Sequence, residues 1–393
     1  MRLLFLSLYF HPARRYGGPI VSTAQLCRGL AARGFQVRAL TTDADGPDRL
    51  DVPAGWREAG ENLRIRYCRR LGGKLGELVA PGLLAVLPRQ VARADAVYVW
   101  GILVWPLPAL ALLCRLFGKP LVISPRGMLF PEALAAKGGK KRLFLAVLRR
   151  IAGARAVYHV TSEEEARAVR EIFPGARTIE VPNGVEVPAE VPAATEGRPY
   201  LLFLGRLHPH KQIELILSAY AAWTRSLDGA PPADLVLAGS GDEGYRRSLL
   251  ETAEREGVAP RVRVLPHVEG PDKARLLAGA EGLILASRSE NFGMSVAEAL
   301  AHGTPCVVTR TAPWSGLERE RCGFWVEDGT EALAGGIGRL MALSPGERRA
   351  WGSRGRAWMI RDFSQEGVAD RMAAALTDLT RSAALSWASR HAG

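Results

Sequence analysis

Short apolar runs alternate along most of the chain with longer segments whose apolar positions recur at helical spacing. Alternation of this kind is typical of βα units, which wind parallel sheets with helices on both faces. We expect strands at residues 3–8, 36–40, 96–100, 121–124, 156–160, 200–204, 235–238, 261–265, 282–286 and 305–309. The predicted fold class is therefore α/β.

The predicted strands form two sets, separated by a segment rich in Pro, Ala and Glu that ends at Pro199. Such a composition is typical of a linker between domains. We predict two Rossmann-like domains facing each other across a cleft, the first over residues 1–188 and the second beginning at residue 189. Ligands of doubly wound sheets bind at the carboxyl ends of the strands, so we expect the active site in that cleft.

Two apolar segments resemble membrane signals. Residues 1–10 look like a signal peptide, but they lack a small-residue cleavage site and lead directly into a proline and a glycine pair. Residues 96–114 carry no charge, but Gly101 and two prolines interrupt them. We interpret the first segment as a buried strand and the second as a strand, a loop and a buried helix, so no transmembrane anchor is predicted.

The composition is that of a folded protein with a large core. Of the 393 residues, 48% are hydrophobic and 23% are charged, which excludes a disordered or collagen-like chain. The five cysteines are scattered and include no C-x-x-C pair. This pattern argues against a disulfide framework and a structural zinc site, and it favours the reducing cytoplasm as the location.

The positive charge is concentrated in the first half of the chain. The net charge is +12, and residues 1–188 carry 28 basic and 15 acidic side chains, whereas residues 189–393 carry 24 and 25. Such an excess can indicate a nucleic-acid or anionic-membrane partner. No RNA- or DNA-binding motif and no basic strip interleaved with aromatic residues is present, so we expect no nucleic-acid partner.

A glycine pair after the first predicted strand is a candidate anion site. Gly17 and Gly18 precede a helical segment, and glycines at such a turn let backbone N–H groups approach an anion. The spacing is not G-x-G-x-x-G, so a glycine turn without a ligand is an equal alternative. Asp43 and Asp45 form a D-x-D string after the second predicted strand, which we interpret as a polar turn and not as a metal site.

The second half opens with a similar turn that carries charge. Gly205 and Arg206 follow a predicted strand, and Lys211 precedes a helical run. Two cations in this position, together with a helix N-terminus, could bind a diphosphate. The alternative is a pair of solvated surface cations.

Two carboxylates flank the start of a later helix. Glu290 lies in the loop before Gly293, where free backbone N–H groups could hold phosphate. Glu298 is expected about two turns into the helix, where it could accept hydrogen bonds from ribose hydroxyls. The alternative is that Glu290 caps the helix and Glu298 is an exposed helical residue.

Together these motifs resemble the family 4 glycosyltransferases, which are retaining enzymes of the GT-B fold. The resemblance rests on Glu290-x7-Glu298, Gly205-Arg206 with Lys211, Pro182-Asn183-Gly184-Val185 and Leu237-Ala-Gly239-Ser-Gly241. It spans nearly the whole chain, and residues 344–356 look like the closing helices of the family. By this resemblance residues 1–188 would bind the acceptor, residues 189–365 would bind the nucleotide-sugar donor, and residues 366–393 would form a helical segment that crosses back to the first domain.

The resemblance also implies roles for individual residues. Arg206 and Lys211 would contact the donor diphosphate and stabilise the leaving group, Glu290 would touch the donor sugar, and Glu298 would bind ribose. The other implied substrate-binding residues are Gly17 and Gly18 opposite the diphosphate, Gly205, His267 and Val268 beside the base, and Asn291, Phe292, Gly293, Met294 and Ser295. Fixed cations and helix N-termini stabilise the negative charge that develops on the diphosphate, so no metal or cofactor is expected beyond the UDP- or GDP-sugar substrate.

Two positions depart from the family pattern. Arg126 precedes Gly127 where many relatives carry a histidine, and Trp100 stands where a second histidine is common. The Ser-Pro-Arg-Gly-Met form resembles a subgroup associated with bacterial polysaccharide and O-antigen assembly. We expect Arg126 to be catalytic by binding the acceptor or the donor phosphate; the alternative is an ion pair with a structural carboxylate.

A basic segment at residues 137–150 mixes cations with an apolar helical face. It could lie on anionic lipid, or its residues Leu143, Phe144, Val147 and Leu148 could pack into the core. We favour peripheral contact with the inner face of the plasma membrane, because the acceptor domain would then reach a lipid-linked sugar.

The predicted function is that of a retaining, metal-independent hexosyltransferase. It would move a hexose-type sugar from a nucleotide-diphosphate sugar to a lipid-linked glycan acceptor in bacterial polysaccharide synthesis. The alternatives are a catalytically silent GT-B subunit that partners another transferase and a nucleotide-sugar epimerase.

Overall fold

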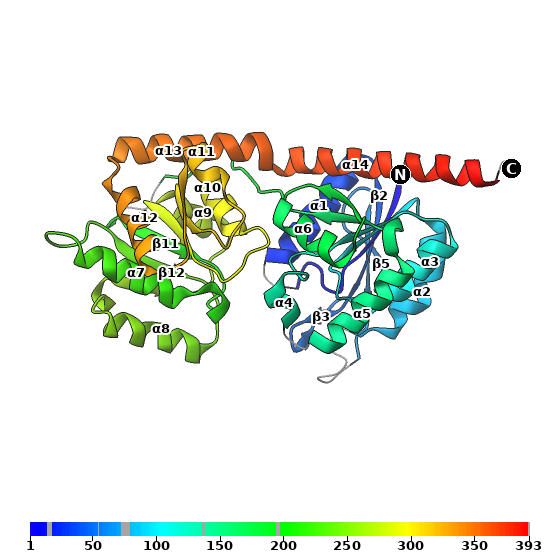
Figure 1. Ribbon diagram of the computed structural model, residues 1–393, viewed down its shortest axis with the longest axis horizontal. Coiled ribbons are helices and arrows are strands. Elements are labelled where there is room, and N and C mark those ends of the chain that lie inside the picture. Colours follow the sequence, from blue (N-terminus) through cyan, green and yellow to red (C-terminus); the bar gives the residue numbers. More distant parts are fainter. Residues whose placement is uncertain (14–17, 54, 72–78, 136–137, 194–196, 392–393) are drawn as a thin grey trace. The chain divides into compact units, whose positions relative to one another are not determined.

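The chain folds into two compact units. The computed structural model describes residues 1–13, 18–53, 55–71, 79–135, 138–193 and 197–391. The first unit contains Met1–Gly184 and Gln365–Gly393, and the second contains Val185–Ser364 (Figure 1).

The second unit begins after Gly184 and not after Pro188, where the linker composition placed the boundary. The backbone N–H of Val185 donates to the carbonyl of Phe363 at 2.8 Å, and Val185 forms a parallel bridge with Ser364. Arg356 also donates to the carbonyl of Pro188 at 2.5 Å. Residues 185–188 are therefore tied to the second unit.

An eight-stranded sheet forms the centre of the first unit, in the order β10-β9-β8-β7-β1-β2-β6-β5. Its strands are β1 (Arg2–Leu6), β2 (Gln36–Thr42), β5 (Gly55–Glu58), β6 (Leu63–Cys68), β7 (Ala96–Trp100), β8 (Leu121–Ser124), β9 (Val157–Val160) and β10 (Arg177–Glu180). All neighbours pair in parallel except β5 with β6. A separate hairpin contains β3 (Ala44–Asp45) and β4 (Asp48–Arg49).

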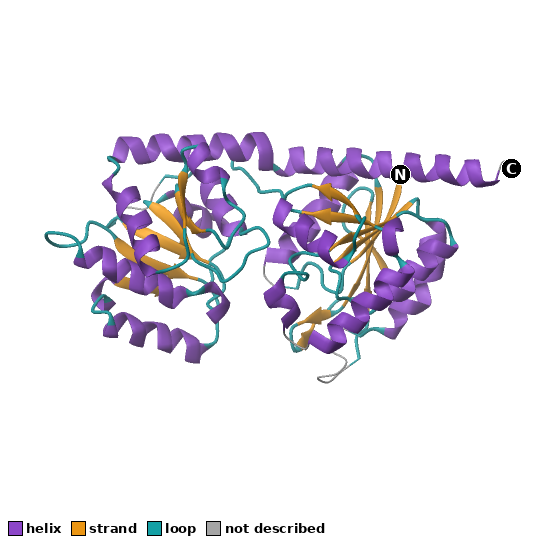
Figure 2. Ribbon diagram, viewed as in Figure 1, coloured by secondary structure: helices purple, strands orange, loops and turns teal. Residues whose placement is uncertain are grey.

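Helices cover both faces of this sheet (Figure 2). They are α1 (Gly18–Ala32), α2 (Pro81–Arg93), α3 (Leu107–Leu116), α4 (Pro131–Ala135), α5 (Gly138–Ile151), the short η1 (Gly153–Arg155), α6 (Glu163–Ile172) and α14 (Gln365–His391). One core lies under α2, α3, α5 and α6, and the other lies under α1 and α14. Met372 and Leu376 of α14 are buried in the second core, and Asp370 of α14 pairs with Arg33, the residue after α1, at 2.6 Å.

The second unit is built on a six-stranded, fully parallel sheet in the order β13-β12-β11-β14-β15-β16. Its strands are β11 (Tyr200–Leu204), β12 (Asp234–Ala238), β13 (Val262–Leu265), β14 (Gly282–Leu285), β15 (Cys306–Thr309) and β16 (Gly323–Val326). Numbered within the unit, this order is 3-2-1-4-5-6, which is that of a dinucleotide-binding Rossmann sheet.

Helices flank this sheet on both faces as well (Figure 2). They are η2 (Pro209–Lys211), α7 (Ile213–Arg225), α8 (Glu243–Arg255), η3 (Ala259–Arg261), α9 (Gly270–Ala278), α10 (Met294–Ala301), α11 (Gly316–Arg319), α12 (Thr330–Ala342), α13 (Pro345–Trp358) and the π-helical turn η4 (Met359–Phe363). α7, α8 and α12 share one core, and α9, α10 and α13 share the other. The α/β prediction with two Rossmann-like units is confirmed.

The sequence pattern missed β5, β6, β10 and β16, which lie at or next to sheet edges. In β6 the exposed Arg64 alternates with buried Leu63 and Ile65, so this strand lacks the continuous apolar run of the central strands. Both apolar segments that resembled membrane signals were interpreted correctly, because they form β1, β7 and α3. Among the helices in the described ranges, none combines the length and the apolar character needed to cross a bilayer.

Candidate active site

The strand order of the second unit reverses between β11 and β14. The connections from these neighbouring strands leave in opposite directions, and ligands of doubly wound sheets bind at the carboxyl ends of such a pair. The loop after β11 carries Gly205, Arg206 and Lys211, and the loop after β14 carries Glu290. Residues nearly eighty positions apart therefore meet at one sheet edge.

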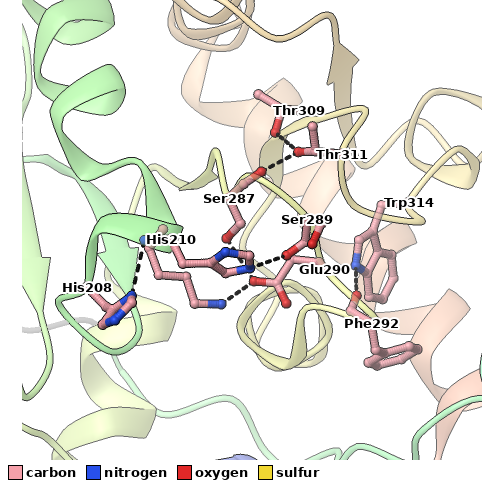
Figure 3. Close-up of polar contacts among 10 residues, drawn as sticks. His208, His210, Ser287, Ser289, Glu290, Phe292, Thr309, Thr311 and Trp314 are labelled. Carbon is pink, nitrogen blue, oxygen red and sulfur yellow. Dashed lines mark hydrogen bonds and ion pairs between the residues drawn. The ribbon is translucent and has the colours of Figure 1, made fainter. Parts of the chain in front are cut away.

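Lys211 and Glu290 form an ion pair at this edge. The hydroxyl of Ser287 donates to the same carboxylate at 2.8 Å (Figure 3). The side chain of Glu290 is only 13% exposed, so water screens the pair weakly. Glu290 therefore holds the ammonium group of Lys211 in place, and it does not cap α10, whose N-cap is Gly293.

Backbone hydrogen bonds join the two loops on either side of this pair. The N–H of Arg288 donates to the carbonyl of His210 at 2.9 Å, and the His210 ring contacts the carbonyl of Ser289 through Nε2 at 2.9 Å (Figure 3). The N–H of Glu290 donates to the carbonyl of Thr311 at 3.0 Å. These bonds restrict the movement of the loop that carries Glu290.

Arg206 is exposed in the loop that carries Lys211, and within the described part of the chain it forms no hydrogen bond or ion pair. Burial and the charges of Arg206, His210 and Lys211 lower the pKa of the neighbouring His208. The lowered pKa favours the neutral form of the His208 imidazole, and Arg206 and Lys211 are the permanently charged groups of this loop.

Close packing of glycines brings the loops after β11 and β12 together. A Cβ atom on Gly239 would lie 1.7 Å from the carbonyl oxygen of Gly205, and one on Gly241 would lie 2.4 Å from that of Leu207. The N–H of Leu207 donates to the carbonyl of Ser240 at 2.8 Å. Only glycine fits at residues 239 and 241, and this contact sets the position of the Gly205–Arg206 peptide.

The loop from Asn291 to Ser295 ends at the N-terminus of α10. Gly293 adopts φ +81°, and Trp314 donates its indole N–H to the carbonyl of Phe292 at 2.5 Å (Figure 3). The first N–H groups of a helix have no acceptor within the helix, so Met294 and Ser295 can present theirs to an anion.

Glu298 lies a little over one turn into α10, nearer its start than the sequence predicted. Its carboxylate pairs at 2.6 Å with Lys273 of α9, so it is not a free exposed acid. His267 and Val268 lie in the loop between β13 and α9; His267 is exposed, and Val268 packs against the core.

The first unit contains the remaining candidates. Gly17 lies outside the described residues, and Gly18 is the first residue of α1. Arg126 adopts φ +56°, and its guanidinium lies over the Trp100 ring at 3.6 Å from the ring centroid. It donates to Asn183 Oδ1 at 2.5 Å and to the Tyr98 hydroxyl at 3.1 Å.

Arg126 has no carboxylate partner among the described residues, so the alternative of a structural ion pair is wrong. The nearby Glu165 accepts from the backbone N–H groups of Gly127 at 2.7 Å and Thr161 at 2.8 Å. Its carboxylate thus stabilises the loop backbone, while the charge of Arg126 has only neutral partners. Arg126 therefore remains able to bind an anion.

A buried histidine supports the Arg126 side chain. His159 lies 2.6 Å from the Tyr98 hydroxyl through Nδ1 and 2.8 Å from the carbonyl of Val181 through Nε2. Burial and the charge of Arg126 lower its pKa well below the usual value, although the contact with Val181 opposes this shift. The neutral ring with its proton on Nε2 satisfies both contacts.

The D-x-D string lies at the β3–β4 hairpin: Asp45 is in β3, and Asp43 immediately precedes this strand. Asp43 accepts a hydrogen bond from the backbone N–H of Arg70 at 2.8 Å, and Asp45 pairs with Asp48 in the hairpin. Within the described ranges no three His, Cys, Asp or Glu side chains gather as metal ligands.

The basic segment that follows α4 is helical from residue 138, and Lys137 lies outside the described residues. The alternative of inward packing holds for only part of this segment. Leu145 and Leu148 are buried, whereas Leu143 is 69% exposed and Val147 is 42% exposed. The apolar face of α5 is therefore split between the core and the surface.

Several residues that build the site carried no signal in the sequence. They are Ser287, Thr311 and Trp314 around Glu290, Lys273 beside Glu298, and Tyr98 and His159 beside Arg126. Except for Ser287, each is far in sequence from the residue it supports, so only the fold reveals the contact.

Both halves of the chain match family models. Residues 189–358 match "Glycosyl transferases group 1", and residues 17–184 match "Glycosyl transferase 4-like domain". Together the two matches cover most of the chain.

Individual proteins show the same similarity. The chain is 34% identical over 169 residues to a D-inositol 3-phosphate glycosyltransferase of Salinispora tropica, covering 41% of this chain and only 34% of that protein. It is 27% identical over 317 residues to a GDP-mannose:cellobiosyl-diphosphopolyprenol alpha-mannosyltransferase of Xanthomonas oryzae, covering 79% of this chain and 80% of that protein. Among solved structures, a sucrose-phosphate synthase from Thermosynechococcus elongatus matches with a TM-score of 0.75 and 21% identity, over 97% of this chain and 99% of that one, which shows a common fold.

Proposed function

The chain belongs to the glycosyl transferases group 1 family and has the GT-B fold, and on this premise we propose that it transfers a hexose-type sugar from a nucleotide-diphosphate sugar to a glycan acceptor. The proposal includes retention of the anomeric configuration and the absence of a metal requirement. The observation that carries it is the Lys211–Glu290 pair beside the exposed Arg206 at the switch point of the second sheet.

The chemistry of sugar transfer matches this arrangement. Cleavage of the glycosyl–phosphate bond leaves negative charge on the nucleotide diphosphate and positive character on the sugar. Lys211 is held by Glu290, so it does not need to reorganise when the charge develops, and Arg206 adds a second cation. In this proposal the carboxylate of Glu290 faces the donor sugar and stabilises its positive character. In this proposal these two cations supply the charge stabilisation.

The donor would extend from this pair along the carboxyl edge of the sheet. We assign its diphosphate to Gly205 and the N-terminus of α10, its ribose to Glu298 and its base to the loop of His267 and Val268. Lys273 fixes the Glu298 carboxylate by the 2.6 Å ion pair, and an oxygen not held there can accept from ribose hydroxyls.

We propose that the acceptor is a lipid-linked glycan. The Xanthomonas oryzae relative is named for transfer to cellobiosyl-diphosphopolyprenol, an acceptor that contains both a lipid and a diphosphate. Arg126 is the residue of the first unit that we assign to an acceptor or donor phosphate, because all its hydrogen-bond partners are neutral. Substitution by lysine would keep the charge and lose the planar stacking on Trp100.

A lipid-linked acceptor requires the enzyme to reach a membrane surface. The packed helices α3 and α5 expose apolar side chains, including Leu116 at 74% and Leu143 at 69%. The cations of residues 140–142 and 149–150 flank them. Each surface cation contributes about 1 kcal/mol toward an anionic leaflet, so we assign this face to peripheral membrane contact.

Ligand-induced stabilisation tests the donor site directly. Thermal melting of the wild type is measured with UDP- and GDP-sugars, beside Arg206→Ala/Lys211→Ala and a control, Arg247→Ala/Arg349→Ala, which removes two exposed cations elsewhere in the second unit. A ligand at about a hundred times its dissociation constant stabilises by roughly 2.7 kcal/mol. We expect a shift with one nucleotide class in the wild type and the control, and none in the site variant.

Two outcomes would contradict the proposal. A folded wild type that neither shifts with any sugar nucleotide nor transfers sugar to a polyprenyl-diphosphate glycan would indicate a catalytically silent subunit. Isomerisation of the free sugar nucleotide without an acceptor would indicate an epimerase. The anomeric proton of the product, observed by NMR, tests retention separately.

A further inference from the structure

A basic pocket lies at the amino edge of the first sheet. It has a volume of about 230 Å³ and lies between the starts of β1 and β2 and the end of α2. Three arginines, Arg2, Arg38 and Arg93, line it together with Gln90. From this geometry we infer a binding site for a phosphate group, presented by a free solute or by a lipid headgroup.

Arg38 is the central residue of this pocket. It extends from β2 onto the face covered by α2, where it donates to Oε1 of the buried Gln90 at 3.2 Å. On its other side the guanidinium lies 5.6 Å from the centroid of the Trp56 ring. Gln90 and Trp56 hold the side chain but do not neutralise it, and none of the described carboxylates pairs with it.

The surrounding charges are predominantly positive. Burial lowers the pKa of Arg38, and so do the charges of Arg93, Arg64, Arg2 and Arg89. The two acids nearby are already paired: Asp95 binds Arg2 at 2.6 Å, and Glu58 binds Arg64 at 2.5 Å. Arg38, Arg89 and Arg93 form no ion pair with any residue of the described ranges.

Such a group of cations is stabilised by an anion. Guanidinium groups bind phosphate oxygens through paired N–H donors, and these bonds are about twice as strong as neutral ones. The pocket volume leaves room for a phosphate group among the three guanidiniums that line it. Because Gln90 already orients the Arg38 side chain, less entropy is lost on binding.

This pocket is separate from the proposed donor site. The donor site lies in the second unit at the carboxyl ends of its strands, whereas the pocket lies at the amino ends of β1 and β2. The inference therefore does not depend on the proposed transfer reaction, and either can fail without the other.

Calorimetric titration with inorganic pyrophosphate tests the site. The full chain carries Arg206→Ala/Lys211→Ala and Arg126→Gln in every sample, so that neither the donor site nor Arg126 can contribute. On this background we expect one saturable site, weakened about tenfold or more by Arg38→Gln and by Arg93→Gln, because each loses a charged hydrogen bond. Asp95→Asn releases the Arg2 side chain and is expected to tighten binding.

Arg28→Gln is the matched control. Arg28 is exposed on α1, which covers the opposite face of the same sheet, so this variant removes the same charge outside the pocket. We expect it to bind pyrophosphate like its parent. Thermal melts of all the variants show whether each is folded, and Arg93→Gln, at an exposed position, serves if Arg38→Gln does not fold.

Vesicles distinguish the two sources of phosphate. Binding to vesicles of phosphatidylglycerol and phosphatidylcholine is compared for Arg38→Gln and Arg28→Gln, which have equal net charge. Weaker binding of Arg38→Gln to the anionic vesicles alone identifies a lipid headgroup, and equal binding with loss of pyrophosphate affinity identifies a free solute. The inference is overturned if the parent binds neither probe saturably, or if Arg28→Gln weakens binding as much as Arg38→Gln.

Discussion

Substituting Gly239 by alanine should damage the proposed donor site without touching any charged residue. Gly239 follows β12 and Gly205 follows β11, its neighbour in the sheet. The new Cβ would lie 1.7 Å from the carbonyl oxygen of Gly205 and 2.8 Å from its carbonyl carbon. Both clashing atoms belong to the backbone, so no side-chain rotation can relieve them.

The size of the effect follows from this clash. Carbon and carbonyl oxygen approach to about 3.3 Å at closest, so the two loops must separate by roughly 1.5 Å. Overpacking of this kind costs about 1–3 kcal/mol of unfolding free energy. The Gly205–Arg206 peptide moves with the loop, and a displacement of about 1 Å at a reacting centre can cost about 10²-fold in rate.

Gly335→Ala provides the matched control. Gly335 lies inside α12 with no atom within 4 Å of the added Cβ, so alanine should stabilise the helix by about 1 kcal/mol. Thermal melting and the initial rate of sugar transfer are measured for both variants. The reasoning is refuted if Gly239→Ala melts at or above the wild-type temperature and retains the wild-type kcat/KM.

Four further predictions follow from the contacts. Lys211→Ala should lower kcat by about 10²–10³-fold in steady-state transfer assays, because it removes a cation that we assign to the leaving group. Burial raises the pKa of all five thiols, so Ellman's reagent at pH 8 should react only after unfolding. Ser344→Ala removes the capping box of α13 and should cost about 1 kcal/mol in urea melts, whereas Ser353→Ala, inside the same helix, should not. His159 has a lowered pKa in the folded state, so the unfolded chain binds the extra proton; the wild type should lose stability as pH falls below about 6.5, by up to about 1.4 kcal/mol per unit, and His159→Gln should flatten this slope in denaturant melts at several pH values.

The central part of each sheet could be predicted from sequence because its strands are buried on both faces. In β7 and β11 every residue is buried, and such strands appear as unbroken apolar runs. Edge strands do not appear as unbroken apolar runs, since one edge or one face of such a strand is exposed to solvent. β10 has two exposed and two half-buried residues, and sequence pattern alone does not distinguish it from a loop.

In the candidate site, too, residues close together in sequence could be predicted to act together, whereas contacts between distant residues could not. Gly205, Arg206 and Lys211 lie within seven consecutive residues, so their spacing along the chain already indicated a common function. The contact between Lys211 and Glu290 depends on β11 and β14 being neighbours, which is a property of the strand order. The spacing also could not show that Glu298 is held by Lys273 from a different helix.

The net charge of each half, counted from the sequence, does not show which of its cations are paired with carboxylates. The fold shows this pairing. The second half is nearly neutral, and two lysines of its candidate site have carboxylate partners, as Lys211 has Glu290 and Lys273 has Glu298, whereas Arg206 has none among the described residues. In the first unit Arg38 and Arg126 instead meet only neutral groups among the described residues. They lie near opposite ends of the strands of one sheet, one at the amino edge and one at the carboxyl edge. We therefore propose that the basic excess divides between separate anion sites, so Arg38→Gln and Arg126→Lys should affect different ligands although both residues contribute to the same net charge.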